Sequence, residues 1–188
     1  MLNQVVVLVG GKGERLNDGF RFSPAIEVPK CLTEVGGKPF VTYAINSLSL
    51  SGVKDIVLIV GYRKEEFEFL KSDVVRLVET AEDVNQVVLN SCESDRIIIL
   101  NGDCYPILDW EELVYKSWPR VPVKPNLRDA GIAVVDRQHI LSRDIDVQNI
   151  FNMMEFYPTC LIQGGLHIGT YQGLERARAY FSIVCFGQ

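Results

Sequence analysis

The chain has 188 residues, of which 47% are hydrophobic and 23% are charged, and its formal net charge is −5. This composition is ordinary for a globular protein, and the length predicts one domain spanning residues 1–188. The acidic balance disfavours a general nucleic-acid binder, because such proteins usually carry a basic face. No apolar run approaches the ~20 residues of a membrane helix, and the residues after Met1 do not resemble a signal peptide, so none is expected. We therefore expect a cytoplasmic protein with neither a nucleic-acid nor a membrane partner.

The cysteines show no C-x-x-C spacing, which disfavours a zinc or disulfide framework. An odd and scattered set predicts reduced thiols. At Cys31 and Cys104, which lie next to candidate site residues, a small buried side chain is expected rather than a chemical role. The five cysteines are Cys31, Cys92, Cys104, Cys160 and Cys185.

The first apolar segment, Val5–Val9, predicts a strand that is buried on both faces of a parallel sheet. Glycines occupy three of the four positions from 10 to 13, so the backbone can turn sharply and present its N–H groups to an anion. Lys12 and Arg15 add positive charge at the same place. Because ligands of parallel α/β sheets bind beyond the carboxyl ends of the strands, this stretch predicts a phosphate site.

The rest of the chain alternates between apolar strands and amphipathic helices. Strands are expected at 55–60, 74–78, 96–100 and 132–135, and helices at 40–50, 64–70, 82–89, 109–115 and 173–181. Alternation at this short spacing predicts an α/β fold with a Rossmann-like, mostly parallel central sheet and helices on both faces.

Asn101-Gly102-Asp103 directly follows the strand expected at 96–100. Asp103 should therefore lie at the carboxyl edge of the sheet, on the same side as the glycine-rich loop. A carboxylate there can hold Mg²⁺ against phosphate oxygens, because Mg²⁺ binds a few carboxylates together with substrate oxygens. The alternative is an ordinary turn aspartate, since Asn-Gly-Asp suits a turn.

The glycine-rich stretch does not match two common phosphate loops. The P-loop spacing is absent, and Leu16 stands where the dinucleotide fingerprint needs its third glycine. The stretch resembles instead the signature of the sugar-1-phosphate nucleotidylyltransferases, in which Gly-Gly-x-Gly-x-Arg-Leu is followed by Pro-Lys and Gly-Lys-Pro. These pieces stand here at residues 10–16, 29–30 and 37–39. Arg15 and Lys30 lie further apart than is usual in the family, so the loop Asn17–Val28 resembles an insertion.

The resemblance extends to the C-terminal part of the chain. Leu161–Thr170 resembles a family element that reads Asp-Ile-Gly-Thr, and His167 stands at the position of a second metal-binding aspartate. Imidazole suits Mn²⁺, Co²⁺ or Zn²⁺ better than Mg²⁺. Four interpretations of His167 stay open: a ligand of a softer metal, a hydrogen-bond donor to phosphate, the mark of an impaired site, or a structural histidine.

Two further matches are partial. Lys124 stands in a Val-Lys-Pro sequence that resembles a Glu-Lys-Pro element, whose lysine contacts the sugar phosphate, and a solvated loop lysine is the alternative. Thr80 resembles the threonine of a Gly-Thr element that contacts base and ribose, but Glu79 replaces the glycine. The base is therefore not fixed by the resemblance.

The resemblance implies a fold of the nucleotide-diphospho-sugar transferase type and an enzyme that joins a nucleoside triphosphate to a sugar 1-phosphate and releases pyrophosphate. Similarity to the heptose-1-phosphate guanylyltransferase-like branch implies GTP and a heptose- or mannose-type sugar. The implied catalytic residues are Arg15 and Lys30. The implied ligands of Mg²⁺, or of Mn²⁺ in view of the histidine, are Asp103 and His167. The implied nucleotide- and substrate-binding residues are Val9, Gly10, Gly11, Lys12, Gly13, Thr80, Gly102 and Lys124. A homodimer is common among such relatives.

Two other functions stay open. The departures at Glu79, Val123 and His167 favour a nucleotide- or sugar-phosphate-binding protein that has lost catalysis. A cytidylyltransferase for an amino-alcohol or alditol phosphate would share the first motif and differ in its acceptor.

Overall fold

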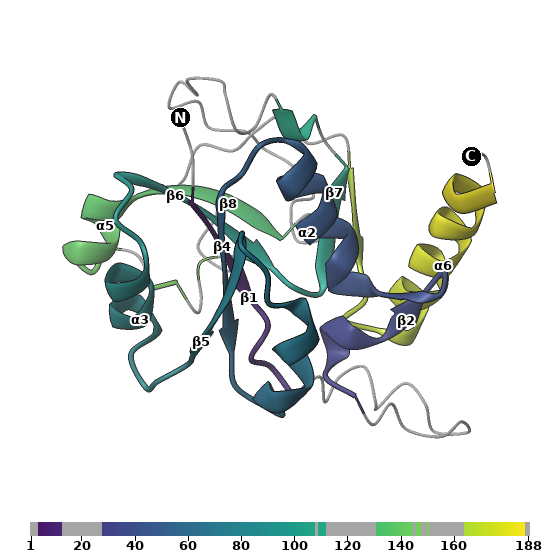
Figure 1. Ribbon diagram of the computed structural model, residues 1–188, viewed down its shortest axis with the longest axis horizontal. Coiled ribbons are helices and arrows are strands. Elements are labelled where there is room, and N and C mark those ends of the chain that lie inside the picture. Colours follow the sequence, from purple (N-terminus) through teal and green to yellow (C-terminus); the bar gives the residue numbers. More distant parts are fainter. Residues whose placement is uncertain are drawn as a thin grey trace.

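The computed structural model describes residues 4–12, 28–107, 109–111, 131–144, 146–147, 150 and 164–186. Within this part of the chain a five-stranded sheet has the order β5-β4-β1-β6-β8 (Figure 1). Its strands are β1 (Gln4–Leu8), β4 (Asp55–Val60), β5 (Val75–Glu79), β6 (Arg96–Asn101) and β8 (Ile132–Asp136). The first four run parallel and β8 pairs antiparallel with β6, which confirms the mostly parallel sheet.

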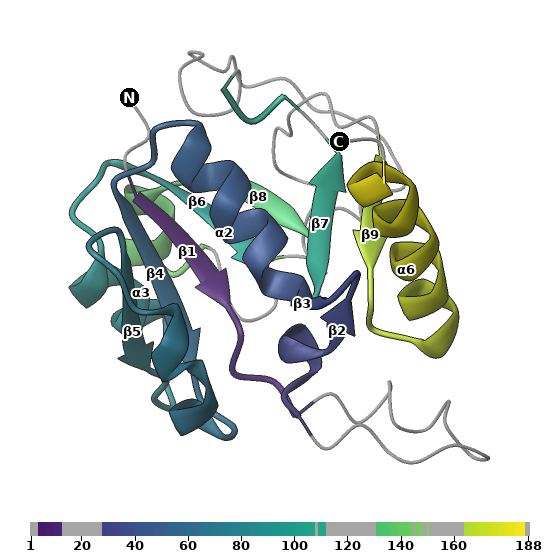
Figure 2. The same cartoon turned by 45° about the vertical axis from the view of Figure 1, so that its right-hand side comes forward.

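Helices cover both faces of this sheet, as the sequence predicts. Val5 and Val7 of β1 belong to a core shared with α2 (Phe40–Leu50), which lies across the sheet in Figure 2. Val6 points to the opposite face, into a core shared with α3 (Val84–Ser91) and α5 (Arg137–Leu141). All three valines are fully buried, which explains why the sequence of β1 is apolar without alternation.

A second layer of structure adjoins the carboxyl end of the sheet. β7 (Cys104–Ile107) pairs antiparallel with β9 (Gly164–His167), and α6 (Tyr171–Phe186) lies beside β9 (Figure 2). Phe181 of α6 stacks on Tyr43 of α2, with the ring centroids 3.7 Å apart. These aromatic contacts hold α6 and the β7–β9 ribbon against α2.

The expected elements agree with the structure where they are long. The helix at 40–50 and the strand at 55–60 have the bounds that the sequence predicts. The segment 64–70 is a 3₁₀ helix, η2 (Lys64–Leu70), which buries only Phe67. The short pairs β7–β9 and β2 (Glu34–Val35) with β3 (Lys38–Pro39) were not expected, because strands of two to four residues carry too little alternation to recognise. Most of the helix expected at 109–115 lies outside the described residues. Among the described helices, none is long and apolar enough to cross a bilayer.

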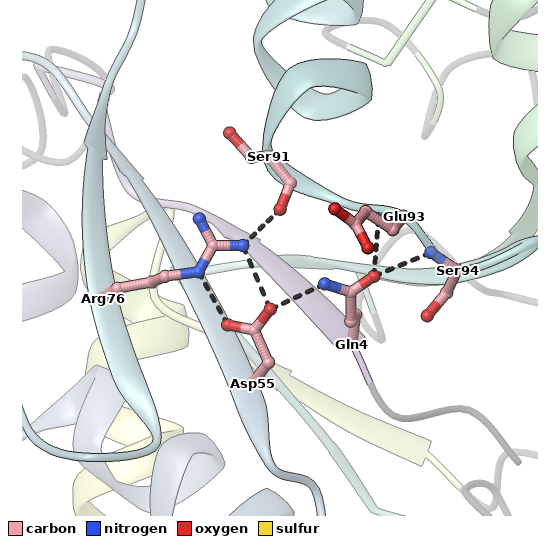
Figure 3. Close-up of polar contacts among 6 residues, drawn as sticks. All are labelled: Gln4, Asp55, Arg76, Ser91, Glu93 and Ser94. Atoms are coloured by element: carbon pink, nitrogen blue, oxygen red, sulfur yellow. Dashed lines mark hydrogen bonds and ion pairs between the residues drawn. The ribbon is translucent and has the colours of Figure 1, made fainter.

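A polar network ties together the amino ends of three strands (Figure 3). Arg76 of β5 donates two hydrogen bonds to Asp55 at the start of β4, at 2.8 and 3.0 Å, and a third to the Ser91 carbonyl oxygen. Gln4 of β1 donates to Asp55 at 2.7 Å and accepts from the backbone N–H groups of Glu93 and Ser94. The network fixes the register of β1, β4 and β5 and anchors the chain that leaves α3.

The pKa of the Asp55 carboxyl is held below its usual value, chiefly by the hydrogen bonds from Arg76. The resulting stabilisation is present above the unfolded pKa of about 3.9 and is lost as the pH falls through the lower, folded pKa. We therefore expect Arg76→Ala to lower the free energy of unfolding by about 1 kcal/mol at pH 7, a modest value because the Arg76 side chain is 42% exposed. The difference in the free energy of unfolding between the variant and the parent should shrink below about pH 4, as measured by urea unfolding over pH 3–7.

The control is Lys71→Ala, which removes an exposed pair with Glu68 and should change stability by less than about 0.5 kcal/mol. An Arg76→Ala deficit that is as large at pH 3 as at pH 7 would contradict this role.

Candidate active site

The carboxyl ends of β1, β4 and β5 bring three loop segments into contact. The Gly10 carbonyl oxygen accepts a hydrogen bond from the Tyr62 N–H at 3.2 Å, so the chain after β1 lies on the chain after β4. A Cβ on Gly61 would stand 2.9 Å from the Thr80 side chain and 3.2 Å from the Gly10 oxygen. Thr80, which follows β5, therefore lies next to the start of the glycine-rich loop, and its contact with base and ribose stays a prediction.

The described part of the glycine-rich loop is open to solvent. Gly11 and Lys12 are exposed, and a Cβ on Gly11 would meet no atom within 4 Å. Val9, by contrast, is 3% exposed and donates its N–H to the Ile59 oxygen, so its side chain belongs to the core. Gly13, Arg15 and Lys124, and residues 17–27 of the expected insertion, lie outside the described residues.

Gly102 lets the turn after β6 lie directly on β1. Its N–H donates to the Leu8 oxygen at 3.0 Å, and a Cβ there would stand 2.5 Å from the Val9 side chain. No side chain fits in this gap without displacing β1. The close approach places the next residue, Asp103, at the carboxyl edge of the sheet beside the glycine-rich loop.

Asp103 is the centre of a buried polar cluster, being only 4% exposed. Its Oδ2 atom is ion-paired with Lys30 Nζ and lies 3.0 Å from His167 Nε2. Burial alone would raise the pKa of this carboxyl, but the hydrogen bond from His167 and the charge of Lys30 outweigh burial and hold the pKa well below its usual value. Asp103 is therefore a carboxylate at neutral pH.

Lys30 and His167 reach Asp103 from distant parts of the chain. Lys30 begins the 3₁₀ helix η1 (Lys30–Leu32), which follows Pro29. His167 is the last residue of β9, and the Ile168 N–H donates to the Asp103 carbonyl oxygen at 2.9 Å. The structure thus unites three residues that the sequence predicts for the site, separated by 73 and 64 positions.

Cys104 completes the cluster and was not expected to take part. Its Sγ lies 3.4 Å from Asp103 Oδ1, and one donor atom each of Asp103, Cys104 and His167 falls within 4.8 Å of the other two. The only signal in the sequence is that Cys104 follows Asp103, because its closeness to His167 depends on the register of β7 and β9.

The cluster offers a site for a divalent metal ion, and its donor chemistry discriminates between ions. Mg²⁺ prefers oxygen ligands throughout, whereas the described cluster offers one carboxylate with an imidazole and a thiol. The nitrogen and sulfur donors suit transition-metal ions better than Mg²⁺, which would take only the Asp103 carboxylate from this cluster and fill its shell with substrate oxygens and water.

A cavity of about 180 Å³ opens on β9 and the start of α6, next to this cluster. His167 lines it together with three polar side chains, Thr170, Gln172 and Arg176. These groups can donate hydrogen bonds to hydroxyl and phosphate oxygens, so the cavity suits a polar or anionic ligand.

Comparisons with known proteins show to which family the chain belongs. The choline-phosphate cytidylyltransferase of Streptococcus pneumoniae is 42% identical over 77 residues, which are 40% of this chain and 31% of that protein. A bifunctional sugar-1-phosphate nucleotidylyltransferase/acetyltransferase of Sulfurisphaera tokodaii is 27% identical over 86% of this chain and 39% of its own length. The chain thus spans well under half of both relatives.

A solved structure of a putative glucose-1-phosphate thymidylyltransferase from Bacillus anthracis has the same fold. It superposes with a TM-score of 0.68 over 94% of both chains, at 18% sequence identity. The model of the MobA-like NTP transferase domain matches residues 5–109, which are more than half of the chain and include β1, α2 and Asp103. The chain therefore belongs to the MobA-like NTP transferase family, in agreement with the resemblance that its motifs show.

Proposed function

We propose that the chain is a nucleotidyltransferase that joins a nucleoside triphosphate to a sugar 1-phosphate and releases pyrophosphate. One observation carries the proposal: Lys30, Asp103 and His167 meet at the carboxyl edge of the sheet, beside a glycine-rich loop, in a chain of the MobA-like NTP transferase family. GTP with a heptose- or mannose-type sugar is our first choice of substrates. A single domain, a homodimer and a cytoplasmic location accompany this proposal as predictions.

The proposed reaction requires no covalent intermediate with the protein. An oxygen of the sugar phosphate attacks the α-phosphorus of the nucleotide, and pyrophosphate leaves in line. Because a phosphate oxygen is already a nucleophile, no general base is needed, and the protein acts by positioning groups and balancing charge.

Each cation has a proposed place in that reaction. Lys30 stands at the sheet edge, held by Asp103, where its ammonium group can bind the α-phosphate and the incoming phosphate oxygen. The backbone of the glycine-rich loop would cradle the triphosphate, and Arg15 would stabilise the leaving pyrophosphate. A bound divalent ion would neutralise further charge on the phosphate oxygens.

The cavity beside His167 supports a sugar over choline as the acceptor group. Hydroxyl, amide and guanidinium groups at Thr170, Gln172 and Arg176 suit sugar hydroxyls and phosphate oxygens. A quaternary ammonium is instead recognised by aromatic faces, and it is repelled by a guanidinium. Choline phosphate stays the second candidate, because the pneumococcal relative is named for that substrate.

The decisive experiment is a pyrophosphate-release assay. The four common nucleoside triphosphates are each paired with glucose, mannose and heptose 1-phosphates and with choline phosphate, in the presence of Mg²⁺, Mn²⁺, Co²⁺ or Zn²⁺. We expect release with one sugar 1-phosphate and one nucleotide. Release with choline phosphate and CTP alone would overturn the choice of acceptor. Nucleotide binding by calorimetry without release from any pair would favour the binding protein that has lost catalysis.

Lys30→Ala tests the proposed contact with the α-phosphate. We expect turnover to fall about 10²–10³-fold, as for other preorganised charged contacts, with a much smaller change in nucleotide affinity. Steady-state kinetics and calorimetry measure the two effects separately. Lys54→Ala, an exposed lysine just before β4, is the control and should keep the parent's turnover. Equal losses of turnover and nucleotide affinity in Lys30→Ala would place Lys30 elsewhere.

Asp103→Asn tests the carboxylate while keeping its shape. We expect turnover to fall at least 10²-fold, because the variant no longer offers a negative charge to Lys30 or to a metal ion. Asp136→Asn, at the end of β8 that lies away from the site, is the matched control. Pyrophosphate release is measured for both, with circular dichroism to confirm folding. A folded Asp103→Asn protein with the parent's turnover would remove Asp103 from the mechanism.

A further inference from the structure

Cys104 is the member of the polar cluster to which the proposed reaction gives no task. It is 2% exposed, and its thiol lies 3.4 Å from Asp103 Oδ1. In the β7–β9 ribbon Cys104 stands directly opposite His167. Residues directly opposite on antiparallel strands have side chains on the same face, so the pairing brings thiol and imidazole together beside the carboxylate.

The separations between these donors suit a small metal ion. With a metal–sulfur bond of about 2.3 Å and a metal–oxygen bond of about 2.1 Å, a tetrahedral ion spaces the two ligand atoms about 3.6 Å apart. The sulfur and Asp103 Oδ1 are 3.4 Å apart, and the His167 nitrogen is 3.0 Å from Oδ2. Lys30 is paired with Oδ2, which leaves Oδ1 on the side that faces the sulfur. Small side-chain rotations would complete the shell.

We propose that Asp103, Cys104 and His167 together bind a transition-metal ion of the zinc or cobalt class, in place of an all-oxygen magnesium site. Three protein ligands leave a fourth position open, as in catalytic zinc sites. That position can accept a phosphate oxygen of the nucleotide or of the acceptor. The inference rests on the proposed function for the use made of the ion, but the ligand set itself is testable without turnover.

The thiol also balances the charge of the site. When the ion binds, the Cys104 proton leaves to solvent and the sulfur coordinates as a thiolate, with no oxidation or reduction. The proton that His167 Nε2 donates to Asp103 moves to Nδ1, so that Nε2 can bind the ion as part of a neutral imidazole. The ion then faces two anionic ligands, Asp103 and Cys104, and one neutral imidazole. This set selects for ions that accept sulfur and against Mg²⁺.

Cobalt spectroscopy of the full chain tests the ligand set. Thiolate coordination to Co²⁺ gives a charge-transfer band in the near ultraviolet. When Co²⁺ is added to the metal-free protein, we expect this band to grow and to reach its full intensity at one equivalent of Co²⁺. The Cys104→Ser variant should lose the band. Gly131 packs against the Cys104 side chain, and the smaller serine side chain fits in the same space. Cys92→Ser is the matched control: Cys92 is fully buried and belongs to the core shared with α3, so the band should persist. Ten equivalents of Mg²⁺ should not displace the cobalt.

The absence of the band in the parent protein, or a band of the parent's intensity in Cys104→Ser, would overturn the inference. Should Cys104→Ser fail to fold, X-ray absorption decides instead, measured on the zinc-loaded parent and on the four single Cys→Ser variants at positions 31, 92, 160 and 185. One sulfur at about 2.3 Å in all five proteins supports the site, and a shell of nitrogen and oxygen alone refutes it. The two proposals can fail separately: a cobalt band without pyrophosphate release removes only the proposed reaction, and magnesium-dependent release without a band removes only the metal inference.

Discussion

The ionised carboxylate of Asp103 is the group around which the carboxyl end of the molecule is built. A buried carboxylate is costly unless it is paired and hydrogen-bonded, and here the compensation comes from Lys30 and His167. Position 102 must be a glycine, because a Cβ there would collide with Val9 and the turn after β6 could not lie on β1. The pairing of β9 with β7 places His167 next to Asp103. The contacts of the Asp103 carboxylate with Lys30 and His167 thus join three segments that are remote in the sequence.

The two ends of the sheet use charge differently. At the amino end the Asp55 carboxylate receives two hydrogen bonds from Arg76 and one from Gln4, so its acceptor capacity is largely filled. At the carboxyl end, within the part of the chain that the structure describes, the acceptor on Asp103 Oδ1 faces a weak thiol donor, and Gly11 and Lys12 are open to solvent. A saturated network stabilises the fold, while an unsaturated one can exchange its contacts for those of a ligand. This difference is why we assign stability to the first and chemistry to the second.

How far the sequence predicts this protein depends on the range of the interactions involved. β1, β4, β6 and α2 were predicted because their apolar patterns are long and their burial is decided locally. Lys30 was found by its Pro-Lys motif and Asp103 by its place directly after the strand expected at 96–100, and the structure places the two in contact. Cys104 is buried, as the sequence predicts. The β7–β9 ribbon and the closeness of Cys104 to His167 were not predicted, because both depend on a strand register that pairs residues 63 positions apart. For Arg15 and Lys124 the implied roles stay predictions.

The histidine and the cysteine are best understood as one change. Replacing a carboxylate by a neutral imidazole at position 167 removes one negative charge from the metal site that the family resemblance implies. In the metal site that we propose, a thiolate at Cys104 restores that charge within the same cluster, while the ligand atoms change from hard oxygen to softer nitrogen and sulfur. The total charge that the site presents to a triphosphate is then conserved, and the identity of the ion is altered. A histidine at position 167 therefore does not by itself indicate lost catalysis, since the Cys104 thiolate of the proposed site supplies the negative charge that an imidazole lacks.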